Sequence, residues 1–198
     1  ILALRNGTKD RVVLLAARQS GAALYEFHNG EWDKVYEERL TEREADAITA
    51  AIKVAAAETG IINFSDIAYG ELIEYRGGQV TLSALGQQAP IAEKKAWDPD
   101  HAKRHVLQES IAALLPDYSV SIGGATSIDV SKRGVDKAYG IRKLCERLGI
   151  FEQDALYVGD ELEKGGNDEA VYKTNVPTQT VKDPAETEAL IKSILASK

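Results

Sequence analysis

The sequence is poor in sulfur-containing residues: its 198 residues include no methionine and a single cysteine, Cys145. One thiol excludes an internal disulfide and is typical of a reducing compartment. Cys145 falls on the apolar side of a predicted helix, where we expect it to pack as a small hydrophobic side chain. Long apolar runs are also missing, because no stretch approaches the roughly 20 residues that a membrane-spanning helix needs. These absences predict a cytoplasmic protein with no membrane partner.

Positive charge is scarce as well. The chain has 24 Lys and Arg against 31 Asp and Glu, which gives a formal net charge of -7 at pH 7, and its basic residues form no stripe. Proteins that bind nucleic acids need clustered lysine and arginine to contact the phosphate backbone. We therefore expect no nucleic-acid partner.

Turn and capping signals divide the chain into elements. His-Asn-Gly at 28–30 is a strong hairpin signal, and Gly-Gly at 77–78 marks the centre of a second hairpin over 71–84. Thr41 and Glu44 form a capping box that begins a long helix, which Gly60 ends. Strands are predicted at about 11–17, 22–27, 32–36, 118–122, 126–130 and 155–159. A further helix is predicted to start at 98 and to end before Pro116, with apolar Val106, Ile111 and Leu114.

The stretch VGDELEKGGNDEAVY at 158–172 places hard oxygen donors after the predicted strand at 155–159. Asp160 ends the strand, and Asn167 and Asp168 stand at the head of the next short helix. Open α/β folds bind ligands at the carboxyl ends of parallel strands, and such oxygens suit Mg²⁺. The stretch therefore predicts a magnesium site that serves phosphate chemistry. The alternative is a capped turn, in which Asp168 is a helix N-cap.

A lysine begins the helix that precedes this strand. Lys137 opens it and Gly149 closes it, and its apolar positions recur at helical spacing, at Ile141, Leu144, Cys145 and Leu148. The helix dipole disfavours a cation at a helix start, so a nearby anion would account for Lys137 better than helix stability does. The alternative is a solvated lysine.

Together, the helix-start lysine, the strand-end aspartate and the GGND turn resemble the third and fourth motifs of the haloacid dehalogenase superfamily of phosphatases and phosphomutases. The resemblance extends to the branch with a large inserted cap, which contains eukaryotic-type phosphomannomutases and sugar-phosphate phosphatases. The stretches that carry it are LIEYRGGQVTLSALGQ at 72–87, SIGGATSIDV at 121–130, RGVDKAYGI at 133–141 and VGDELEKGGNDEAV at 158–171. It implies an α/β fold, with a partial Rossmann-like core and an inserted α+β cap domain.

The order of the predicted elements agrees with two parts. Hairpins and helices between 40 and 131 are typical of an α+β layer, whereas helix and strand alternate after 131, as in doubly wound sheets. We therefore predict a cap domain at 40–131 and a core domain formed by 1–39 and 132–198.

The resemblance also implies the chemistry, a Mg²⁺-dependent transfer through an aspartyl-phosphate intermediate. Asp160 matches the family's metal-binding aspartate, and Asn167 and Asp168 match residues that order the shell of the metal. Lys137 matches the lysine that neutralises the nucleophile and the phosphate. The resemblance thus implies catalytic roles for Lys137 and Asp160.

The nucleophile itself is missing. This superfamily carries it in a D-x-D-x-T pattern, which does not occur in the 198 residues. Asp98-Pro-Asp100 has the spacing of the two aspartates, but it follows charged residues rather than an apolar strand. The chain also begins with a bulky isoleucine. We expect a fragment without the N-terminal nucleophile segment and without appreciable activity alone; the alternative is a natural pseudoenzyme.

Substrate contacts are expected in the cap. In phosphomannomutases, basic cap residues and a Ser/Asp pair hold the far phosphate and the sugar hydroxyls; the matching residues here are Arg76, Gln87, Lys94, Ser127 and Asp129. Gln87 stands where the mutases have an arginine, so a second phosphate would lose one charged partner. The alternatives are that Arg76 is a solvated strand residue and that Ser127 and Asp129 satisfy backbone groups of a hairpin.

The loss of that arginine favours a phosphohydrolase, so the sequence predicts a Mg²⁺-dependent phosphohydrolase that acts on a sugar phosphate. One alternative is a phosphomannomutase-like phosphosugar mutase. Another is a module that binds a sugar phosphate for regulation without turnover. Because the mutase relatives pair through their caps, the resemblance also implies a homodimer.

Overall fold

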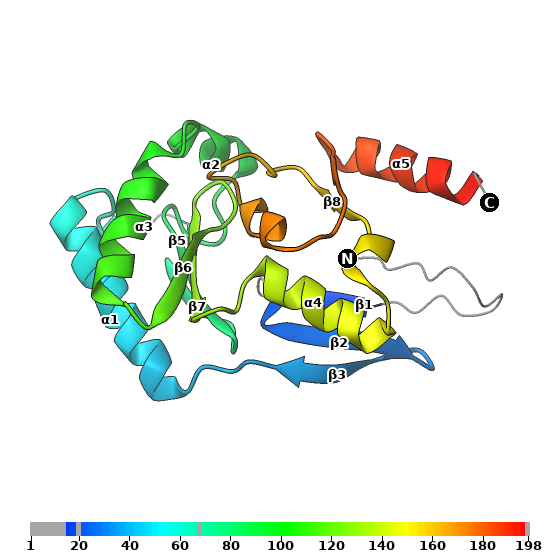
Figure 1. Cartoon of the computed structure of the whole chain (residues 1–198). Helices are drawn as coiled ribbons and strands as arrows, with labels where there is room; N and C mark the ends of the chain where they lie inside the picture. The colour runs from blue at the N-terminus through cyan, green and yellow to red at the C-terminus, as the bar shows by residue number, and fades with distance from the viewer. Residues whose placement is uncertain (1–14, 19–20, 67–68, 197–198) are drawn as a thin grey trace.

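The computed structural model of the chain describes residues 15–18, 21–66 and 69–196, which form three sheets and five α-helices (Figure 1). One antiparallel sheet has the order β1 (Leu15–Arg18), β2 (Ala23–His28), β3 (Glu31–Glu37), and a second has the order β4 (Ile73–Tyr75), β5 (Gln79–Ser83), β7 (Ser127–Lys132), β6 (Tyr118–Ile122). β8 (Tyr157–Gly159) and β9 (Thr178–Thr180) pair in parallel. The helices are α1 (Glu42–Thr59), α2 (Ile91–Trp97), α3 (Ala102–Leu114), α4 (Lys137–Leu148) and α5 (Pro184–Ala196), with 3-10 turns η2 (Glu152–Asp154) and η3 (Glu169–Lys173).

Local signals set the ends of the helices. The Thr41 side chain accepts the Glu44 N–H while the Glu44 carboxylate accepts the Thr41 N–H, so the predicted capping box is confirmed. Gly60 ends α1 at φ 65°, in the left-handed region that favours glycine. Gly149 ends α4 in the same way. The predicted strand at 11–17 lies partly outside the described residues, and its described part is β1.

The four-stranded sheet packs one face against α1 and α3, which lie on the same side of it (Figure 1). Val80 and Leu82 on β5 and Ile128 and Val130 on β7 are 0–1% exposed on that face. Alternation along each strand then sends the intervening side chains to the opposite face. We call this opposite face the polar face; it comprises Gln79, Thr81, Ser83, Ser127, Asp129 and Ser131.

Helix α3 differs in part from the prediction. It begins at Ala102 rather than at 98, and Val106 and Leu114 are 49% and 41% exposed. The buried positions are Arg104, Leu107 and Ile111. They follow the i, i+3, i+7 spacing of one helix face, and Val106 and Leu114 lie off that face. Helix α2, in a charged stretch, was not predicted.

Helix α4 joins the first sheet to the parallel pair. Leu144 packs against Leu24 of β2, and Ile141 packs with Val171 of η3. Cys145 is 4% exposed in the same cluster, so its prediction as a packed thiol is confirmed. Among the described residues, no helix is both long enough and apolar enough to cross a membrane. The division into domains at 40 and 131 stays a prediction.

Candidate active site

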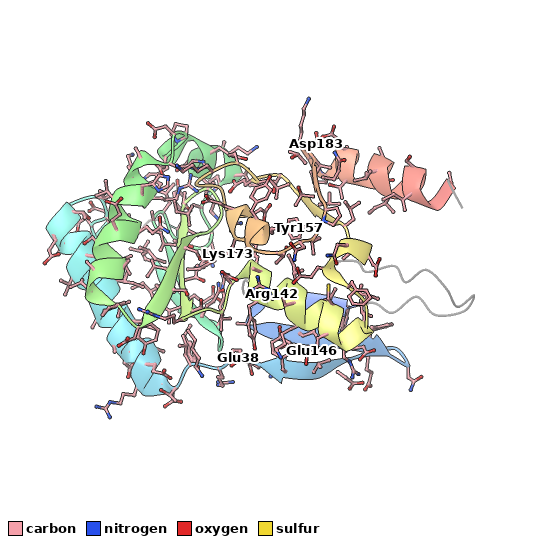
Figure 2. All side chains as sticks on the ribbon, viewed as in Figure 1. Glu38, Arg142, Glu146, Tyr157, Lys173 and Asp183 are labelled. Atoms are coloured by element: carbon pink, nitrogen blue, oxygen red, sulfur yellow. The ribbon has the colours of Figure 1, made fainter. Side chains whose placement is uncertain are left out.

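Lys137, the first residue of α4, forms the centre of the site. Its Nζ lies 2.5 Å from Oδ1 of Asp168, which directly precedes η3. The same Oδ1 accepts a hydrogen bond from the Tyr157 hydroxyl of β8 at 2.7 Å (Figure 2 labels Tyr157). The anion expected beside Lys137 is therefore the carboxylate of Asp168. The side chain of Asp168 makes no capping hydrogen bond to η3.

Asp168 is 4% exposed, yet its carboxyl group ionises readily. Burial alone would raise its pKa, but the hydrogen bonds from Lys137 and Tyr157 and the charge of Lys137 outweigh burial and lower the pKa below its usual value. Burial and the neighbouring Asp168 carboxylate raise the pKa of Tyr157, so its hydroxyl remains a donor. Gly159 makes room for this arrangement, because a Cβ there would lie 2.3 Å from Asp168 Oδ2.

The three predicted magnesium residues lie in the segment between β8 and η3. Asp160 directly follows β8, is exposed, and has no hydrogen-bond or ion-pair partner among the described residues. The Asn167 N–H donates to Glu161 Oε2 at 3.2 Å, and the Glu161 N–H reaches Asp168 Oδ2 at 3.4 Å. In the described part of the chain, no group of three or more His, Cys, Asp or Glu side chains is arranged to hold a metal ion.

The donor chemistry nevertheless fits Mg²⁺. Proteins usually hold this ion through one or two carboxylates, and waters complete its coordination. Asp160 supplies a carboxylate at the carboxyl end of a parallel strand. It lines a pocket of about 310 Å³ together with Asp183. Asp183, which Figure 2 labels, precedes α5. Asp183 Oδ1 is already used, because it accepts the Glu186 N–H at 2.9 Å.

The three predicted cap residues that precede α3 come together around Gln87. The Arg76 guanidinium donates to Glu74 Oε2 at 2.8 and 2.6 Å and to Gln87 Oε1 at 3.1 Å. Lys94 Nζ donates to the Gln87 carbonyl at 2.9 Å. Gln87 Nε2 is buried without a hydrogen-bond partner among the described residues. The charge of Arg76 is therefore balanced by Glu74, and one donor of this group is unused.

Ser127 and Asp129 lie on the polar face. Asp129 Oδ1 accepts hydrogen bonds from Thr81 Oγ1 at 2.7 Å and Gln79 Nε2 at 2.9 Å, and Ser127 Oγ lies 3.5 Å from Ser83 Oγ. The hydrogen bonds of both side chains are therefore made to other side chains and not to hairpin backbone groups. Burial raises the pKa of Asp129, while the hydrogen bond from Thr81 and the charge of Arg76 lower it to a smaller degree, as does the charge of Lys137.

The charges of Arg76 and Lys137 both favour the ionised form of Asp129, so we treat the Lys137 group and the cap group as one candidate site. Sequence reasoning missed Tyr157, Gln79 and Thr81 in this region. Tyr157 has no signal of its own in a short apolar strand. The sequence does contain a signal for Gln79 and Thr81, because polar residues alternate with apolar ones from 79 to 83, which is typical of a strand with one polar face.

Comparison with known proteins gives a consistent family. Residues 55–197 match the family model for eukaryotic phosphomannomutase. A phosphomannomutase of Triticum aestivum is 34% identical over 140 residues, which cover 67% of this chain and 53% of that protein. The phosphomannomutase of Saccharomyces cerevisiae is 32% identical over 108 residues, which cover 52% of this chain and 41% of that protein. The chain thus spans about half the length of the curated relatives it matches.

Solved structures are similar in fold. An N-terminally truncated, IMP-bound IMP-nucleotidase of Plasmodium falciparum has a TM-score of 0.56 at 17% identity, over 88% of this chain and 46% of that chain. A protein of Streptococcus mutans has a TM-score of 0.54 at 14% identity, over 89% of this chain and 75% of that chain. At these identities the similarity concerns the fold alone, and it confirms the predicted α/β fold.

Proposed function

Since the chain belongs to the eukaryotic phosphomannomutase family, we propose that the full-length protein transfers a phosphoryl group on a phosphorylated sugar, as a phosphosugar mutase does. The observation that supports this most is the Lys137 ammonium, held by buried Asp168 next to the carboxyl end of β8. The nucleophilic carboxylate would come from residues outside these 198, because they contain no D-x-D-x-T pattern.

Lys137 would stabilise the transferred phosphoryl group. That group carries negative charge over three oxygens, and a fixed cation lowers the barrier most where it needs no reorganisation. An ammonium has three donors, and Lys137 gives one to Asp168. Tyr157 fixes Asp168 in turn, so the ammonium is held from two elements, β8 and the segment before η3. The lowered pKa of Asp168 favours the charged form of its carboxylate, which holds the ammonium.

Asp160 is the residue that we expect to hold Mg²⁺, with Asn167 and Asp168 ordering its shell. When bound, the ion supplies positive charge that stabilises the phosphoryl group during transfer. On the cap side, Ser127 and Asp129 would contact the sugar hydroxyls, and Arg76, Gln87 and Lys94 would surround its distal end.

A phosphohydrolase is the second candidate, and one observation favours it. A mutase must hold a bisphosphate, but the Arg76 charge is balanced by Glu74 and the neighbouring side chain is the neutral Gln87. A distal phosphate would therefore meet less positive charge than it meets in the mutases. If the protein binds the bisphosphate weakly, water rather than the sugar accepts the phosphoryl group.

The two candidates differ in product. Full-length protein is incubated with Mg²⁺ and a hexose 1-phosphate, and phosphorus NMR follows the products. Accumulation of hexose 6-phosphate supports the mutase, whereas release of inorganic phosphate supports the phosphohydrolase. Binding of the hexose phosphate without any turnover would contradict both enzymes and would support the non-catalytic binding module.

Two variants tie the activity to this site. Asp160→Asn should abolish turnover, because it removes the free carboxylate. Asp183→Asn is the matched control: it changes a carboxylate on the same pocket, and asparagine can still cap α5. Turnover that survives in Asp160→Asn would refute the proposed site. The homodimer through the cap stays a prediction, which light scattering of the purified protein checks.

A further inference from the structure

Gln79 has a buried side-chain amide whose nitrogen makes hydrogen bonds and whose oxygen makes none among the described residues. It lies on the polar face and is 3% exposed. Its Nε2 donates to Thr81 Oγ1 at 2.8 Å and to Asp129 Oδ1 at 2.9 Å. Its Oε1 is buried and has no hydrogen-bond partner within the described residues. A buried acceptor without a partner is destabilising, because it has lost its hydrogen bonds to water, so its presence in a native protein needs an explanation.

The orientation of this amide follows from its neighbours. Turning it by 180° would place Oε1 against Asp129 Oδ1, where two acceptors repel each other. Thr81 Oγ1 already donates its one proton to the same Oδ1 at 2.7 Å. Nε2 must therefore face Asp129, and Oε1 is the atom left without a partner.

Asp129 is held by only one of its two oxygens. Thr81 and Gln79 both donate to Oδ1, whereas no described residue donates to Oδ2. Asp129 is partly exposed, unlike the buried Gln79 and Thr81 behind it. Oδ2 lies against Gly123, where an added Cβ would come within 3.1 Å of it. The two buried residues thus fix the Asp129 carboxylate from behind and leave Oδ2 as an unused acceptor.

Two unpartnered acceptors on the polar face, Gln79 Oε1 and Asp129 Oδ2, determine which ligand groups can bind there. Oε1 and Oδ2 would repel phosphate oxygens, which are acceptors too, and would bind groups that donate, such as hydroxyls. The charges of Arg76 and Lys137 favour the ionised form of Asp129, and these are the cations to which we assign an anionic part of the same ligand. This pattern fits a sugar phosphate whose hydroxyls lie on the polar face.

We propose that Gln79 is a positioning and specificity residue for sugar recognition: it holds Asp129 through Oδ1, and its Oε1 accepts a hydrogen bond from a ligand hydroxyl. The inference rests on the proposed function, because it takes the ligand to be a phosphosugar. It adds that selectivity among sugars is set by Gln79 and Asp129 together, through hydroxyls rather than through a second phosphate.

Calorimetric titration of the full-length protein tests this with three probes: a hexose phosphate, its series of monodeoxy analogues, and inorganic phosphate. For the parent, loss of one particular hydroxyl should weaken binding by about fivefold to thirtyfold, the scale of one hydrogen bond. In Gln79→Met, which removes both the donor and the free oxygen, the hexose phosphate should bind weaker by that factor. Inorganic phosphate should bind as before, within about twofold, and the critical deoxy analogue should bind as well as the hexose phosphate does.

Two more variants keep the test decisive. Asp129→Asn retains an oxygen for Thr81 and Gln79 but turns the free acceptor into a donor, so it should lose the same hydroxyl preference in a folded protein. Gln179→Met, on exposed β9, is the matched control and should change nothing.

The outcomes separate the two proposals. If the parent prefers the hydroxylated ligand and Gln79→Met keeps that preference, the inference is wrong and the proposed function stands. Equal weakening of all three probes in Gln79→Met would also overturn it, because that reports a structural role. If the parent binds no phosphosugar, the proposed function fails, and this inference fails with it.

Discussion

Replacing Arg104 by methionine should be one of the most damaging single changes that this chain can undergo. Arg104 and Asp98 form an ion pair at 2.8 Å in which the side chains are 2% and 0% exposed. The guanidinium also donates to the Gly124 carbonyl at 2.8 Å and to the Asp98 carbonyl at 3.1 Å. Asp98 in turn accepts the N–H groups of Lys103 and Arg104, so it caps the first turn of α3.

Removal of one partner from a buried ion pair costs about 3–5 kcal/mol, because the remaining charge stays buried without compensation. We expect Arg104→Met to lose that amount of unfolding free energy at pH 7. Burial opposes ionisation of Asp98, but the hydrogen bonds from Arg104 and from the two N–H groups lower its pKa below the usual value. Because the pKa of Asp98 is lower in the folded protein, ionisation of Asp98 stabilises the folded state at pH values above the unfolded pKa of about 3.9. This stabilisation is lost as the pH falls through the lower pKa of the folded state. The difference between parent and variant should therefore shrink below about pH 4.

Urea denaturation followed by circular dichroism at pH 7 and pH 3 measures both effects. Arg133→Met, which removes a cation from an exposed position after β7, is the control and should cost less than about 0.5 kcal/mol. A loss below about 1 kcal/mol for Arg104→Met at pH 7 would refute the reasoning. A loss of equal size at pH 3 would show that packing, and not the charge of Asp98, is responsible.

Three further predictions concern the site. In full-length protein, Lys137→Met should lower kcat by about a hundredfold, which is the effect of removing one preorganised charge. The same change should raise the pKa of Asp168, which carbon NMR measures. An unchanged kcat would contradict the role of the lysine. Gln87→Arg should improve binding of a hexose bisphosphate relative to the monophosphate by about tenfold in calorimetry, and an unchanged ratio would mean that position 87 does not face the ligand. Gly159→Ala should lower the melting temperature, because its Cβ would lie 2.3 Å from Asp168 Oδ2, whereas Gly124→Ala, with nothing within 4 Å, should leave it unchanged.

The sequence predicted best what depends on neighbours in the chain. The capping box at Thr41 and the closing Gly60 gave α1 to within about a residue, and Lys137 and Gly149 did the same for α4. The signals at Thr41, Gly60 and Gly149 act through hydrogen bonds within one turn of helix, so they depend little on distant contacts. The strand at Tyr118–Ile122 was also predicted with its observed bounds.

Features that depend on distant contacts were harder to predict. Gln79 and Asp129 are separated by 50 positions, and only the register of β5 against β7 brings them together. Asp168 was assigned to the magnesium site from its motif, but its nearest partners are the Lys137 ammonium and the Tyr157 hydroxyl. Composition and spacing do not report which oxygen of a carboxylate is already in use, and that detail decides what each acid can bind.

The distribution of charge around the site bears on how a mutase could work with a neutral residue at position 87. Lys137 offers positive charge at the start of α4, and the polar face offers the unpartnered acceptors of Gln79 and Asp129. Arg76 is already paired with Glu74. A mutase has to bind its sugar in two orientations, and ring hydroxyls are present in both of them. If the polar face holds the ring through hydroxyls, it can serve both orientations without a strong site for the second phosphate. We therefore expect the hydroxyl contacts of Gln79 and Asp129 to matter more for this protein than the arginine that Gln87 replaces.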